Sequence, residues 1–179
     1  MLYAFGFEQV AVVVSDLYFV DPDPGEAQEG AERGVRLELR RLERDPLKGS
    51  IYSAQPITVD RPIWRVDLFE SVAGEPGSFD RTHHHPAFAG WEPGRRHYVT
   101  ELSAHPLEWL ARRLSDLEGV AGDAGLAPGE IGAADVAALR RAAPEILDAV
   151  RRLLEQVRAT PSPPATAEQR LVGARVGWL

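Results

Sequence analysis

The amino-acid sequence predicts an α+β domain: a curled or partly closed antiparallel β-sheet of about five to six strands, followed by C-terminal helices that pack on it. Apolar and polar residues alternate along much of the first hundred residues, which is typical of half-buried strands. After Pro106 the apolar residues recur instead at helical spacing. Turn residues separate the short strands closely, which favours hairpins and therefore antiparallel pairing.

Length and composition restrict the class of protein. The chain has 179 residues, the length of one domain, and a hydrophobic fraction of 44%, so we expect a packed core. It contains no cysteine, which excludes disulfides and thiolate ligands. No apolar run approaches the roughly 18 residues of a membrane span, and the N-terminus has no signal-peptide pattern. We therefore expect a cytoplasmic protein without a membrane partner. The net charge of −7 weighs against a general nucleic-acid binder.

The predicted strands follow in order. The β-branched run at residues 10–20 predicts a buried strand, which the prolines of residues 21–25 end. Residues 35–40 alternate between apolar and charged side chains and predict a strand with one wet face. Residues 63–72 give the clearest pattern. We expect further extended segments at residues 51–59, 79–85 and 96–102, with a bend at residues 60–62.

The helical part begins at Pro106, a residue suited to a first helical turn. Leu107, Leu110, Leu114 and Leu117 then form one apolar stripe. A second helix is expected at residues 133–159, with a kink or restart at Pro144.

Three parts of the chain follow from these patterns. Residues 1–103 form the sheet core, residues 104–159 the helical part of the same domain, and residues 160–179 a proline-rich linker with an apolar tail. The tail ends in Val-Gly-Trp-Leu, so we expect it to dock on its own domain or to form a homo-oligomer contact.

All five histidines lie between His83 and His105. On a strand, His83 and His85 project to one face and His84 to the other, so the pair can share a metal ion. His97, on the following predicted strand, would complete a three-histidine set. The expected metal ligands are therefore His83, His85 and His97. Such a set suits a divalent transition metal, either Zn, Fe or Ni, and leaves a position open for a small-molecule substrate.

Glu70 has the register of the core residues on its predicted strand. It either points to water at the sheet edge or faces a cavity, where it would need a partner. In the second case it could support the metal or take part in proton transfer, and His84 is a candidate for the same roles.

Two families share local features with this stretch. His83-His84-His85 resembles the His-x-His pair in the metal motif of cupins, although residues 89 and 90 are alanine and glycine and the nearest glutamate is Glu92. Residues 63–102 resemble the core of the TumE-type family of bacterial toxins through Trp64–Asp67, Phe79–Pro86 and Arg95–Val99. This second resemblance implies an activity directed at RNA. The alanine- and arginine-rich composition also resembles that of proteins from high-GC, actinobacterial-type bacteria.

RNA cleavage without a metal needs a base, an acid and positive charge beside the phosphate. Histidine titrates near neutral pH and can fill both proton roles. Arginine can bind the phosphate with two parallel hydrogen bonds. The residues available for these tasks are His84, His85, His97, Arg81 and Arg96.

Three functional hypotheses remain open from the sequence. The first is a metal-dependent hydrolase or oxygenase-like enzyme acting on a small molecule. The second is a metal-independent, toxin-like ribonuclease, and the third is a non-enzymatic protein-interaction module in which the histidines are structural.

Overall fold

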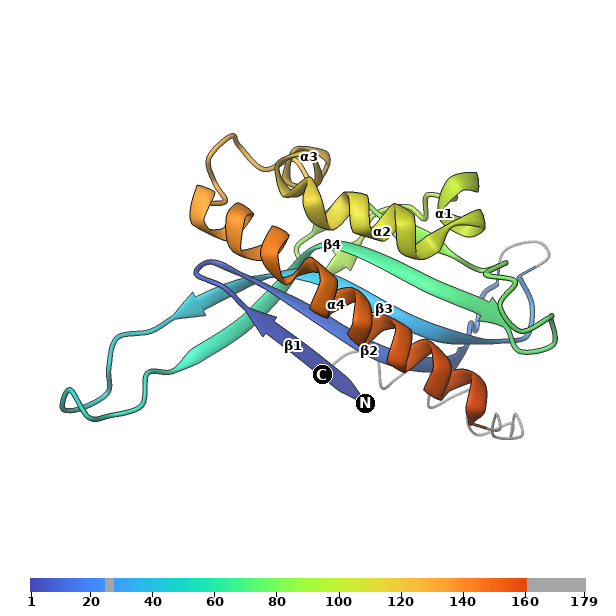
Figure 1. Ribbon diagram of the computed structural model, residues 1–179, viewed down its shortest axis with the longest axis horizontal. Coiled ribbons are helices and arrows are strands. Elements are labelled where there is room, and N and C mark those ends of the chain that lie inside the picture. The colour runs from blue at the N-terminus through green and yellow to red at the C-terminus, as the bar shows by residue number, and fades with distance from the viewer. Residues whose placement is uncertain (25–27, 161–179) are drawn as a thin grey trace.

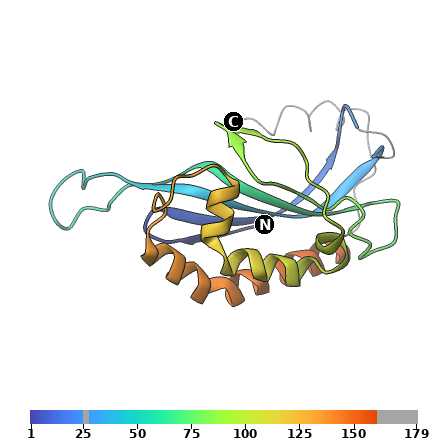
Figure 2. The ribbon, with the colours of Figure 1, turned by 90° about the horizontal axis from the view of Figure 1, so that it is seen from above.

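The computed structural model describes residues 1–24 and 28–160 of the chain. Its main sheet has five antiparallel strands in sequence order, so each strand lies beside the next one along the chain. The strands are β1 (Leu2–Gly6), β2 (Val10–Val20), β3 (Ala31–Arg44), β4 (Ile57–Ser71) and β5 (His83–His85). The sheet is curled and does not close (Figures 1 and 2). The predicted α+β class, with an antiparallel sheet followed by helices, is confirmed.

Alternation along the strands gives the sheet two chemically different faces. On β3 and β4, the paired residues Leu37 and Val66 point to the apolar face, and the paired residues Arg36 and Asp67 point to the other face. The apolar face supplies buried residues of the core: Val12, Val14, Val35, Leu37, Leu39, Trp64, Val66 and Leu68. This alternation is what the sequence pattern predicts for β3 and β4.

Helices cover the apolar face. They are α1 (Thr100–Ala104), α2 (Pro106–Ser115), α3 (Leu117–Asp123) and α4 (Ala133–Ala159). Figure 2 shows α2 and α4 on the same side of the sheet. Leu110 of α2 and Ile146 and Val150 of α4 are fully buried in this layer. Burial of such an apolar stripe supplies most of the stability of a helix in a protein.

The prediction for Pro144 is a kink or a restart of the helix. The restart is wrong, because α4 continues through Pro144 as one helix. Proline removes one backbone hydrogen bond from a helix, but packing of the stripe on both sides of it compensates for that loss.

Two further predictions of local structure are corrected. Residues 96–102 do not form a regular strand, because only His97 pairs, as an isolated bridge to His84, and α1 begins at Thr100. The Glu-Leu-Ser-Ala sequence of α1 instead forms a helical turn, with the Ser103 N–H donating to the Val99 carbonyl at 3.1 Å. Residues 60–62, where a bend is expected between two strands, lie within the single strand β4. The pairing register between β3 and β4 shifts there, at Pro62. A register shift accommodates a proline that has no N–H to donate.

The face opposite the helices is covered by the segment that follows β5. This segment includes the short hairpin of β6 (Phe88–Ala89) and β7 (Glu92–Pro93). The end of β3 and the start of β4 extend beyond the rest of the sheet as an arm, and residues 45–56 form its tip (Figures 1 and 2). Within the described ranges, no helix has the length and apolar character to cross a membrane.

Candidate metal centre

The face of the sheet opposite the helices, here called the polar face, carries a group of buried charged side chains. Asp67 on β4 lies opposite Arg36 on β3 and opposite His83 on β5. His85 lies opposite Arg65 on β4. Because residues directly opposite in an antiparallel pair share a face, all five side chains meet on the polar face. Asp67 is only 1% exposed, so water does not solvate its charge.

His83, His85 and Asp67 converge on one point. The distance from Asp67 Oδ2 to His83 Nε2 is 3.3 Å, and that to His85 Nε2 is 3.7 Å. Ligand atoms from the three residues all lie within 4.8 Å of one another. Two imidazoles and one carboxylate at this spacing can hold a metal ion.

Backbone carbonyls fix the orientation of both imidazoles. His83 Nδ1 lies 2.8 Å from the Arg81 carbonyl oxygen, and His85 Nδ1 lies 2.8 Å from the Gly94 carbonyl oxygen. A carbonyl oxygen only accepts hydrogen bonds, so each Nδ1 carries the proton and donates it. In the form that binds a metal ion, Nε2 carries no proton and its lone pair points toward Asp67, whereas a His83 ring that is also protonated on Nε2 donates a hydrogen bond to the Asp67 carboxylate instead. In metalloproteins, a histidine that binds the metal through one ring nitrogen usually donates the N–H of its other ring nitrogen to a carboxylate, a carbonyl or water.

Two arginines neutralise the Asp67 carboxylate. Arg36 donates to both carboxylate oxygens, at 2.7 and 3.2 Å. Arg65 Nε lies 3.2 Å from Asp67 Oδ2, and Arg65 Nη2 lies 2.9 Å from His85 Nε2. Burial would raise the pKa of Asp67, but the charge of Arg36, a hydrogen bond from His83 and the charge of Arg65 together hold it far below its usual range.

The same surroundings keep His85 neutral. Burial, and then the charge of Arg65, lower the pKa of His85 to about 4. At neutral pH the centre therefore contains an ionised carboxylate and a neutral imidazole, which are the forms that bind metal ions.

His84 and His97 lie on the opposite face, beneath the helices. Their residues form a hydrogen-bonded bridge, and their ring centroids are 5.5 Å apart. The His84 ring also contacts Trp64 and Trp109. Burial, and then the nearby His97, lower the pKa of His84 to about 4. The structure therefore does not bring His97 to His83 and His85, because its pairing with His84 turns it to the other face.

Glu70 is also separated from the centre. It lies on the helix-covered face, where Arg33 lies 3.2 Å from Oε1 and Arg158 lies 3.3 Å from Oε2. Gly77 donates its backbone N–H to Oε2 at 2.6 Å. Glu70 thus has the partners that a buried carboxylate needs, and they are arginines rather than the histidines.

The two remaining predicted residues lie near the edge of the polar face. Arg81 contributes its carbonyl to His83, and its side chain lies 3.6 Å from the Asp80 carboxylate. Arg96 donates to Asp21 and to Gln28, each at 2.9 Å. Their guanidinium groups thus contact other polar groups, namely Asp80 and the Glu29 carbonyl for Arg81 and Asp21 and Gln28 for Arg96.

The fold and this centre define the class of the protein as an α+β protein with a buried histidine–aspartate group that can hold a metal ion. Comparisons with known protein families, curated proteins and solved structures find no significant match to this chain. The local resemblances to cupins and to the TumE-type toxins therefore stay predictions that depend on the residues that suggested them.

Proposed function

We propose that the protein binds one divalent transition metal through His83 Nε2, His85 Nε2 and the Asp67 carboxylate. The observation that carries this proposal is that these three groups converge on one point. In addition, each of the two histidines donates its Nδ1–H to a backbone carbonyl, which fixes the orientation of the ring. Histidine tautomers fixed by a second hydrogen bond are characteristic of ligands that are organised before the metal arrives. Two histidines and one carboxylate leave coordination positions open, as in zinc hydrolases and in iron(II) oxygenases.

The open positions support an enzyme rather than a purely structural metal. A metal in this centre would supply Lewis-acid chemistry to a bound water or substrate. The protein would hold the ligands in place. The hairpin of β6 and β7, which lies over the polar face, would limit the access of water to the metal. The proposal extends to a small-molecule substrate, a hydrolytic or oxidative reaction, and Zn, Fe or Ni as the metal.

The metal-independent ribonuclease has less support. Its expected residues divide between the two faces of the sheet, with His84 and His97 on one face and His85 on the other. A single phosphate cannot contact both sets through the sheet. Cleavage of RNA that continues in the presence of a chelator would favour this alternative over the metal enzyme.

Elemental analysis of protein purified without a histidine tag tests the proposal. We expect about one metal ion per chain in the wild type and almost none in the His83→Ala/His85→Ala variant. His97→Ala is the matched control, because it removes a histidine from the other face and should leave the metal content unchanged. Metal-free wild type that also fails to bind added Zn²⁺, Fe²⁺ or Ni²⁺ would contradict the proposal.

A further inference from the structure

The arm formed by β3 and β4 presents apolar side chains to solvent. Ile51 is 81% exposed and Tyr52 is 90% exposed. Leu47 and Ile57 are exposed as well, so four of the eight large hydrophobic side chains that are exposed in the described residues lie on or beside residues 45–56. Single exposed apolar residues are common, but a cluster at the end of a projecting arm marks an interaction surface.

Hydrogen bonds within the tip hold this surface in place. Asp45 N–H donates to the Pro56 carbonyl at 3.1 Å, and Ser53 N–H donates to the Ser50 carbonyl at 2.9 Å. Gln55 Nε2 donates to the Asp45 carbonyl at 3.0 Å. The tip is therefore a closed loop whose backbone is ordered by its own contacts, and the Ile51 and Tyr52 side chains stay outside it. Such preorganisation lowers the entropic cost of binding.

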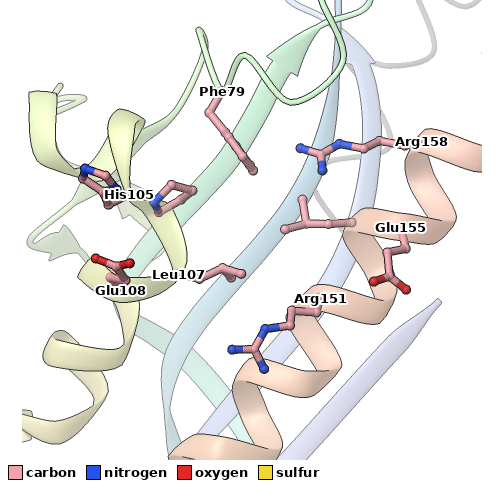
Figure 3. A pocket seen from close by; sticks show the side chains of 9 residues that line it. Phe79, His105, Leu107, Glu108, Arg151, Glu155 and Arg158 are labelled. Atoms are coloured by element: carbon pink, nitrogen blue, oxygen red, sulfur yellow. The ribbon is translucent and has the colours of Figure 1, made fainter.

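A groove with both apolar and charged lining residues lies toward the other end of the molecule. It has a volume of about 410 Å³ and is formed by the start of α2, the end of α4 and Phe79. Phe79, Leu107 and Leu154 supply apolar lining, and charged residues of both helices stand around it (Figure 3). The groove can receive an aliphatic and an aromatic side chain together.

One charged residue of the tip, Lys48, is complementary to the groove. Lys48 at the tip has no ion pair within the described part of the chain, nor have Glu108 and Glu155 at the groove. The groove arginines are already paired, Arg151 with Asp148 and Arg158 with Glu70. The unpaired charge of the groove is therefore negative, and it suits the ammonium group of Lys48.

We propose that the groove binds the arm of a second copy of this chain. Ile51 and Tyr52 would contact the apolar lining, and Lys48 would pair with Glu155 or Glu108. The arm lies toward one end of the long axis of the molecule, and the start of α2 and the end of α4, which form the groove, lie toward the other (Figures 1 and 2). Two copies lying antiparallel would thus make two equal contacts about a two-fold axis, which closes the assembly as a dimer. This inference does not depend on the metal centre.

Sedimentation velocity on the full chain tests the proposal. We expect a dimer for the wild type and a dimer dissociation constant raised about tenfold or more in Ile51→Ser/Tyr52→Ser. Leu2→Ser is the matched control, since Leu2 is also strongly exposed, at 61%, but lies on β1 away from the arm. That variant should dimerise like the wild type, and chelation of metal should leave the dimer intact.

A charge exchange distinguishes this contact from a general effect of surface polarity. Lys48→Glu should weaken the dimer by repulsion, and Glu108→Lys/Glu155→Lys in the same chain should restore it. A wild type that stays monomeric at about 100 μM would overturn the proposal. So would a dimer that persists in the arm variant, or one that is lost instead in Trp178→Ser/Leu179→Ser. That last result would assign the contact to the C-terminal tail, which lies outside the described residues.

Discussion

The two faces of β5 place the same residue type in opposite chemical surroundings. His83 and His85 donate through Nδ1 to backbone carbonyls and direct Nε2 toward Asp67. His84, between them in sequence, contacts tryptophan rings, and its Nδ1 has no hydrogen-bond partner within the described residues. The difference shows that the chemistry of a histidine cluster depends on the face of each residue, and that the number of adjacent histidines does not decide it.

The carboxylates of the two faces extend this comparison. Asp67 and Glu70 are both buried, and each contacts two arginines. Asp67 also contacts two histidines, whereas Glu70 joins the sheet to α4 through Arg158 and accepts a backbone N–H from Gly77. Glu70 therefore has the role of a tie between structural elements. Asp67 combines such a tie with a set of potential metal ligands.

The largest expected effect is that of Asp67→Asn. This change leaves Arg36 and Arg65 without their buried counter-charge, which should lower the free energy of unfolding by about 3–5 kcal/mol. Glu70→Gln should cost less, about 1–3 kcal/mol, because the Arg158 side chain is 31% exposed and water can solvate its charge. Urea unfolding monitored by tryptophan fluorescence measures both. Equal losses, or a larger loss for Glu70→Gln, would contradict the difference between the two faces.

The pH dependence of stability gives the next largest effect. His84 and His85 have pKa values lowered from 6.5 to about 4, so the unfolded chain binds protons there that the folded chain does not. Stability should therefore fall as the pH drops from about 6.5 toward about 4, by a loss on the order of 3 kcal/mol per histidine. His84→Phe should remove its share of this loss and leave metal binding unchanged.

A buried carboxyl group acts in the opposite direction within this pH range. Glu32 is 1% exposed, and burial raises its pKa. Its folded form therefore holds a proton more firmly than its unfolded form, and this contribution stabilises the fold as the pH falls. The measurement is consequently the difference between His84→Phe and the wild type, each unfolded in urea across this pH range. An unchanged pH dependence in His84→Phe would contradict the assignment of a low pKa to His84.

Much of the fold could be predicted because it depends on local patterns. Alternation along β3 and β4 and the helical spacing of α2 and α4 are periodic signals that a single sequence contains. The failures occurred where tertiary packing decides. Pro144 stays within α4 because the helix is held against the sheet on both sides of it. The segment after Arg96 forms one bridge and then turns into α1 instead of continuing as a strand.

The candidate site was only partly predictable for the same reason. The shared face of His83 and His85 follows from their spacing of two residues on a strand. Asp67, Arg36 and Arg65 were missed as members of the centre, because the register between strands brings them there and spacing along one strand does not reveal it. The available signal was that Arg65 and Asp67 alternate with core residues on β4, so their charges require partners on the other face.

The smallest expected effect is the change in metal affinity when Arg65 is replaced. This change tests whether the group of charged side chains is a metal centre or only a network of ion pairs. Its guanidinium donates to His85 Nε2, the lone pair that a metal ion would need, and it adds positive charge 3.2 Å from Asp67 Oδ2. Arg65→Met should therefore tighten metal binding about tenfold, equivalent to about 1.4 kcal/mol. Arg36 still neutralises Asp67 in this variant, so the fold should persist.

Arg40→Met is the matched control, because Arg40 lies on the same face and pairs with Glu38 rather than with the centre. Competition with a chromophoric chelator for Co²⁺ or Zn²⁺ measures both affinities. Weaker binding by Arg65→Met would mean that the guanidinium positions His85 for the metal instead of competing with it, and the two roles are thus distinguished by the sign of the change.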